Sequence, residues 1–188
     1  TLVSHVWCEG TCEHYWLTGD PTAIEAARMT ADHYAGTYLN HYDFTNCRLA
    51  GWHLILTLSL YRATGDPYYL NAARIIVDRV LERRTPGGGW DRQLTGGHCR
   101  CWTKCRGTCG FMQVLLSDGL LMYLASSHDP ARADSLRQAL ATATGAMIDD
   151  LGDTSEGCFR YTSCPGSFDA MRYTWPIMWL FDQLEPEL

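Results

Sequence analysis

The sequence predicts an all-α fold of repeated helix hairpins, and two observations support this prediction. The first is a recurring turn motif: Tyr15-Trp-Leu-Thr-Gly-Asp-Pro21 is echoed by Tyr61-Arg-Ala-Thr-Gly-Asp-Pro67, and a degenerate copy spans 123–130. The second is that apolar residues recur at helical spacing after each Asp-Pro pair, and no segment requires the alternation of a β-strand. Successive hairpins of this kind are expected to form an arc with disulfide-rich loops.

Each copy of the motif marks the end of one helix and the start of the next. Thr-Gly ends the first helix, Asp is the N-cap of the second, and Pro occupies its first turn. The segments 49–61 and 111–123 are apolar nearly all round, which is typical of inner helices buried between two layers, whereas the helices after the turns have polar faces. The predicted helices span 4–17, 21–39, 47–63, 67–83, 110–126, 130–150 and 168–184.

Two long loops, 84–109 and 151–167, are rich in glycine, cysteine and aromatic residues. Loops of this length in a small domain are usually functional or cross-linked. Each loop precedes an inner helix, so both are expected at the end of the helices opposite the Thr-Gly-Asp-Pro turns. We predict a site at that end, which would also contain His5, Trp7, Glu9, Arg48 and Trp52.

Composition limits the classes of function. The 188 residues fit one domain, 1–188, and 46% hydrophobic with 19% charged residues is ordinary for a folded protein. The net charge of −6 and the absence of a basic run argue against nucleic acid. The apolar stretch 54–60 is far shorter than the roughly 20 residues that a membrane helix needs, so no membrane span is predicted.

Nine cysteines indicate an oxidising compartment, and we predict a secreted, extracellular protein. The chain begins without Met, which suggests either a removed signal peptide or an excised piece. The odd count leaves a thiol for an intermolecular disulfide in a homo-oligomer. A zinc site of His98 and four loop cysteines is an alternative, but the spacing matches no paired zinc motif, so we predict no metal or cofactor. The disulfide candidates are Cys8, Cys12, Cys47, Cys99, Cys101, Cys105, Cys109, Cys158 and Cys164.

Two segments resemble a known family. His5-Val-Trp7-Cys-Glu9-Gly10, followed by Tyr-Trp-Leu-Thr-Gly-Asp20, resembles the His-x-Trp-x-Glu-Gly and Tyr-x-Leu-Thr-Gly-Asp signature of the C-terminal toroid of the exo-rhamnogalacturonan lyase and YetA-like family; 50–66 resembles its next helix pair. The resemblance implies a partial (α/α) toroid acting on a glycan. That family forms a closed ring, usually after a β-rich domain, whereas seven helices are predicted here. An incomplete ring would leave an apolar face for another subunit to cover.

The resemblance implies two chemistries. In a polysaccharide lyase acting on a uronic-acid-containing glycan, His5 would be the base, Tyr15 or Tyr161 would assist it, and Arg48 or Arg160 would neutralise the uronate carboxylate. In a glycoside hydrolase, Glu9 would pair with Asp43 or Asp91. The residues expected to be catalytic are His5, Glu9, Tyr15 and Arg48. Those expected to bind substrate are Trp7, Trp52, His53, Trp90, Asp91, His98, Trp102, Arg160 and Tyr161.

Two functions therefore remain open from the sequence. One is a carbohydrate-active enzyme with a glycan as its partner. The other is a non-catalytic, disulfide-stabilised subunit that self-assembles into an extracellular oligomer or filament. A glycan-binding module that kept the groove without the chemistry is a third, weaker hypothesis. Fold ancestry alone does not decide between them.

Overall fold

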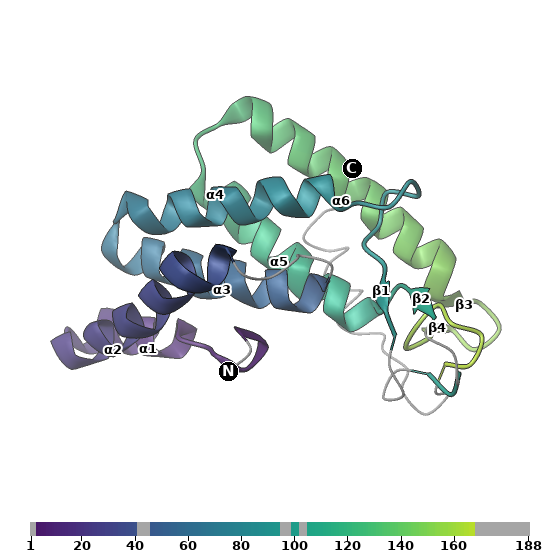
Figure 1. Cartoon of the computed structure of the whole chain (residues 1–188), viewed down its shortest axis with the longest axis horizontal. Coiled ribbons are helices and arrows are strands. Elements are labelled where there is room, and N and C mark those ends of the chain that lie inside the picture. Colours follow the sequence, from purple (N-terminus) through teal and green to yellow (C-terminus); the bar gives the residue numbers. More distant parts are fainter. Residues whose placement is uncertain (1–2, 41–45, 95–98, 102–104, 168–188) are drawn as a thin grey trace.

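The computed structural model describes residues 3–40, 46–94, 99–101 and 105–167, and this part of the chain is mostly helical (Figure 1). The all-α prediction is confirmed. Its α-helices are α1 (Glu9–Thr18), α2 (Pro21–Asp32), α3 (Cys47–Thr64), α4 (Pro67–Glu82), α5 (Gly110–Ser126) and α6 (Pro130–Leu151). Shorter elements are η1 (Val3–His5), η2 (His33–Thr37), η3 (Tyr38–Asn40), and the strands β1 (Arg92–Gln93), β2 (Arg106–Gly107), β3 (Gly152–Asp153) and β4 (Cys158–Phe159).

The repeated turns adopt the geometry that their sequence predicts. Gly19 and Gly65 lie in the left-handed region with φ of 70° and 69°, and each donates its N–H to a tyrosine carbonyl four residues earlier at 2.7 Å. Asp20 and Asp66 then cap α2 and α4 by accepting an N–H at 2.9 Å. Asp129 caps α6 in the same way although its turn lacks the glycine. The second helix of each hairpin therefore begins at the same local signal, an aspartate side chain that accepts a hydrogen bond from a backbone N–H in the first turn.

Two predicted helices differ from the structure. The helix expected at 4–17 begins only at Glu9, after the short turn η1. The helix expected at 21–39 stays α-helical to Asp32 and continues as the π turn η2 and the 3-10 turn η3. Gly36 lies in that irregular part, where glycine weakens a regular helix because its backbone is unusually free when unfolded. The segment 168–184 lies outside the described residues.

Helices α3 and α5 form the centre of the described structure. Both are buried on most sides, as the sequence predicted for inner helices. Gly51 faces Leu115 and Gly119 faces Leu54, so the two helices run side by side in the same direction. A Cβ on Gly51 would lie 2.6 Å from the carbonyl carbon and oxygen of Leu115, so only glycine allows this approach. Helices α4 and α6 pack along this pair, and α1 packs against α3 (Figure 1).

Candidate functional site

The residues predicted at the start of the first hairpin lie together on the surface. His5, Trp7 and Glu9 are exposed around the N-terminus of α1. The Trp7 side chain, 63% exposed, leans against Trp52 of α3 with ring centroids 5.5 Å apart and an interplanar angle of 48°. Flat aromatic faces open to solvent are suited to contact an apolar face of a ring-shaped ligand. The structure therefore brings into contact two aromatic residues that the sequence placed at the same end of the helices.

A hollow of about 570 Å³ opens between the C-terminal part of α3 and α5. A second hollow, of about 300 Å³, shares His128 with the first and continues toward Arg137 on α6. The guanidinium of Arg62 lies 5.6 Å from the ring centroid of Trp16, so an aromatic and a cation flank one rim. The polar side chains that line the first hollow are Tyr61, Arg62, Asp118, Ser126 and His128.

Asp118 is the unusual group in this hollow. It is the only charged residue of α5, and its carboxyl is partly buried without a hydrogen bond from the part of the chain that the structure describes. Burial, assisted by the negative charge of Glu9, raises the pKa of Asp118 to about 6. Carboxyl groups with a raised pKa in a cleft are candidates for proton transfer. The sequence prediction missed Asp118, although a lone acid in an otherwise apolar helix was a signal that could have identified it.

Other predicted residues lie elsewhere. Tyr15 and Arg48 are half-buried, in α1 and in the first turn of α3. Asp91 pairs with Arg106 at 2.9 Å on the loop beside β1, and Arg160 donates to the carbonyl of Asp150 at 2.6 Å. These contacts give both charges a structural role on the long loops. His98, Trp102 and Asp43 lie outside the described residues.

Three side chains predicted to contact substrate are in the interior. His53 is fully buried, and burial lowers its pKa to about 4. Trp90 is 4% exposed and donates its indole N–H to the carbonyl of Val80 at 2.9 Å, while Tyr161 is 6% exposed and stacks on Phe111. Aromatic and histidine side chains suit a core as well as a ligand groove, and in this fold these three are packed in the core. The structure does not bring these three to the hollow.

The cysteines correct one prediction. All nine lie within the described ranges, and all nine are free thiols, so the expected disulfides are not formed. Four of them, Cys99, Cys101, Cys105 and Cys164, have Sγ atoms within 4.8 Å of one another, and these are the residues able to hold a metal. The zinc alternative from the sequence had Cys109 in place of Cys164. Cys109 instead precedes α5 and is buried.

Comparison with known proteins adds no identification: no family model, curated protein or solved structure matches this chain. Among the described residues, no helix is both long enough and apolar enough to cross a membrane. Among the described residues, side chains able to do chemistry converge in the hollow beside Asp118 and in the group of four thiols.

The raised pKa of Asp118 predicts a stabilising substitution. In the folded chain Asp118 holds its proton up to about pH 6, against a usual pKa of 3.8, so folding binds a proton between these values and stability falls as the pH rises through them. Asp118→Asn removes the charge, and allowing for partial exposure we expect it to add about 2 kcal/mol at pH 8 and nothing below pH ~3.5. Urea unfolding at both pH values measures this. Asp149→Asn, on an exposed position of α6, is the matched control, and an equal gain from both variants would contradict the prediction.

Proposed function

We propose that this protein is an extracellular, carbohydrate-active protein of partial (α/α)-toroid architecture that binds a glycan in the hollow between α3 and α5. The observation that carries the proposal is Asp118, a half-buried carboxyl in an open hollow. Burial and the negative charge of Glu9 raise its pKa. The ring pair of Trp7 and Trp52 lies outside the lining of the hollow and supports the proposal as a second contact surface, since sugars stack on such rings. The resemblance of the first hairpin to a glycan-active family supports it further.

The two carboxyl groups favour hydrolysis over elimination. Asp118, protonated near pH 5 to 6, would donate its proton to the glycosidic oxygen as the bond to the anomeric carbon breaks. The Glu9 carboxylate would take a proton from the water that attacks the anomeric carbon, which balances the reaction. A lyase would need His5 and Arg48 or Arg160 to act together. Arg160 is engaged by the carbonyl of Asp150, which leaves a lyase with Arg48 alone for the uronate carboxylate.

The test is turnover of defined oligosaccharides by the purified chain at pH 5.5. Pectic rhamnogalacturonan fragments and neutral galactan fragments serve as the two substrates, and new reducing ends report hydrolysis while the absorbance of an unsaturated uronate reports elimination. We expect Glu9→Gln and Asp118→Asn each to lower kcat by 10²-fold or more, since general acid–base catalysis contributes roughly this much. Asp149→Asn should leave the rate unchanged.

The result of that assay separates the alternatives. Unsaturated product with intact activity in Asp118→Asn would replace the hydrolase by a lyase. Binding of a fragment without turnover, lost in Asp118→Asn, would leave a glycan-binding module. Neither binding nor turnover by the folded chain would refute the carbohydrate function.

A second candidate is the self-assembling structural subunit, and exposed apolar side chains favour it. Leu17 is 86% exposed, Met29 72% and Trp16 47%, on helices α1 and α2. Large apolar groups open to solvent are commonly covered by another subunit. A homo-oligomer, with or without an intermolecular disulfide, stays a prediction from the sequence.

A further inference from the structure

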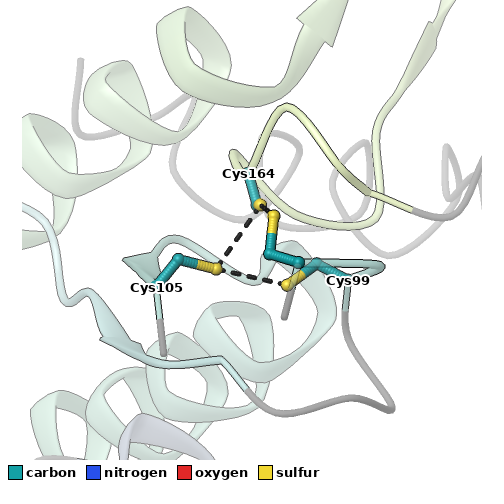
Figure 2. A group of neighbouring side chains, drawn as sticks. Cys99, Cys105 and Cys164 are labelled. Carbon is teal, nitrogen blue, oxygen red and sulfur yellow. Dashed lines mark hydrogen bonds between the residues drawn. The ribbon is translucent and has the colours of Figure 1, made fainter. Parts of the chain in front are cut away.

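The Sγ atoms of Cys99, Cys101, Cys105 and Cys164 all lie within 4.8 Å of one another. Figure 2 shows the side chains of Cys99, Cys105 and Cys164 pointing toward one another. Their Sγ atoms lie 3.2 Å apart for Cys99 and Cys105, 3.1 Å for Cys101 and Cys164, and 3.4 Å for Cys105 and Cys164. A Zn–S bond of about 2.3 Å places the sulfurs of a tetrahedral site ~3.8 Å apart. The observed set therefore needs only small side-chain rotations to surround one ion.

The same distances do not describe disulfides. A disulfide joins its sulfurs at about 2.05 Å, and each sulfur can bond only one other. Here Cys164 contacts both Cys101 and Cys105, and Cys105 contacts both Cys99 and Cys164. Thiols that share neighbours in this way are arranged like ligands around a common centre.

Backbone contacts hold the ligands of the two loops together. Arg100 donates its N–H to the carbonyl of Gly166 at 2.7 Å, and Cys99 forms a bridge with Ser167, so the segment 99–101 runs beside 166–167. Further along, Ser163 donates to the carbonyl of Thr108 at 3.0 Å. The cluster is thus assembled by the fold and not by one local motif. That explains why the spacing of the four cysteines in the loop 84–109 matched no paired zinc motif.

Gly166 shows how closely the two loops meet at the sulfurs. A Cβ there would lie 2.9 Å from the Sγ of Cys101, and the Gly166 N–H donates to the Sγ of Cys164 at 3.4 Å. Amide donors to sulfur are the contacts that orient and stabilise thiolate ligands. Within the described residues, no carboxylate or imidazole joins the group, so its donors are all soft sulfur atoms.

We propose that Cys99, Cys101, Cys105 and Cys164 bind one Zn²⁺ as a four-thiolate structural site that fastens the loop 99–109 to the loop 158–167. An all-sulfur tetrahedral set selects Zn²⁺ or a single iron over harder cations. Four protein ligands leave no open position, so the ion has a structural and not a catalytic role. On binding, the thiols release their protons to solvent and the sulfur lone pairs bond to the metal, with no change of oxidation state. The site is independent of the glycan function proposed above.

Metal content tests this directly. The full chain, purified under reducing conditions and incubated with zinc chloride, is expected to retain one zinc per chain after gel filtration, as measured by elemental analysis. Exchange with Co²⁺ should give the intense visible bands of tetrahedral cobalt and the near-ultraviolet charge-transfer band of Co–thiolate bonds. Cys105→Ser and Cys164→Ser should each weaken zinc binding by 100-fold or more, whereas Cys158→Ser, which alters a cysteine outside the cluster, should bind as the wild type does.

Two results would overturn the proposal. One is reduced, folded wild type that retains no zinc and gives no tetrahedral cobalt spectrum. The other is zinc binding that survives in both Cys105→Ser and Cys164→Ser. If the serine variants fail to fold, the stoichiometry and the cobalt spectrum of the wild type still decide, because a site lacking thiolates has no charge-transfer band. Iron in place of zinc, with the same variants affected, would support the site and change only the ion.

Discussion

Gly51→Val is expected to destabilise the fold by at least about 4 kcal/mol, enough to unfold many domains of this size. Gly51 lies where α3 meets α5, and a Cβ there would be 2.6 Å from the carbonyl carbon and oxygen of Leu115. Backbone atoms inside a helix cannot rotate away as a side chain can, so the helices would have to separate and lose buried contacts along their length. Gly51→Ala should show the same effect at about 3 kcal/mol.

Gly145→Ala is the matched control for this prediction. Gly145 also lies inside a helix, α6, but a Cβ there meets nothing within 4 Å. Alanine favours helix over glycine, so this variant should gain up to about 1 kcal/mol. Urea unfolding followed by circular dichroism measures both. Equal stability of Gly51→Ala and wild type would mean that α3 and α5 do not pack as closely as the structure shows.

Local signals explain why the hairpins could be predicted. The Thr-Gly-Asp-Pro motif specifies a left-handed residue, a cap and a proline within four positions, and each acts on its immediate neighbours. The start of α1 was harder, because Cys8 precedes it without a side-chain cap and no sequence feature marks the boundary. The end of α2 was also missed, because its sequence keeps helical spacing past Asp32 while the backbone changes to a π turn.

The sites were only partly predictable, because each depends on residues distant in sequence. The sequence placed Trp7 and Trp52 at the same end of the helices but did not predict the contact between their rings. The pKa of Asp118 is raised by burial and by the negative charge of Glu9, and neither cause can be seen in the sequence of α5 alone. Cys164 meets Cys101 across 63 positions, which no spacing rule could anticipate.

The burial of His53 and Trp90 illustrates the limit of arguing from residue type. An imidazole or indole suits a ligand groove, but each also has a polar atom that a core can satisfy. The Trp90 indole donates to Val80, and His53 lies against the ring of Tyr34 with centroids 6.1 Å apart. The sequence places His53 on an apolar helix and Trp90 on a glycine-rich loop, but it does not say whether the space around either side chain is open.

Removal of zinc from the four-thiolate site is expected to cost several kcal/mol and to unfold the two loops before the helices. A structural zinc contributes its binding energy to folding, since the unfolded chain has no preformed site. After chelation under reducing conditions, the amides of Arg100 and Ser163, which bridge the loops, should lose protection from hydrogen exchange. Amides in the middle of α3 should stay protected at first, because α5 covers that helix without the cluster.

The order in which the loops and the helices unfold shows whether the metal acts as a clamp, which here means that it fastens only the two loops together. If the thiols merely filled space, chelation would leave exchange in the loops unchanged, and Cys105→Ala would behave like any small cavity variant. If the metal holds the loops, Cys105→Ser should reproduce the exchange pattern of the chelated wild type, and Cys158→Ser should not. Loss of protection throughout α3 and α5 at the same chelator concentration would contradict the clamp, because it would show that the metal holds the whole fold. The loop 99–109 leads directly into α5, and the loop 158–167 is joined to the end of α6 through β3 and a short turn. A metal that fastens these loops together therefore restrains how α5 and α6 meet.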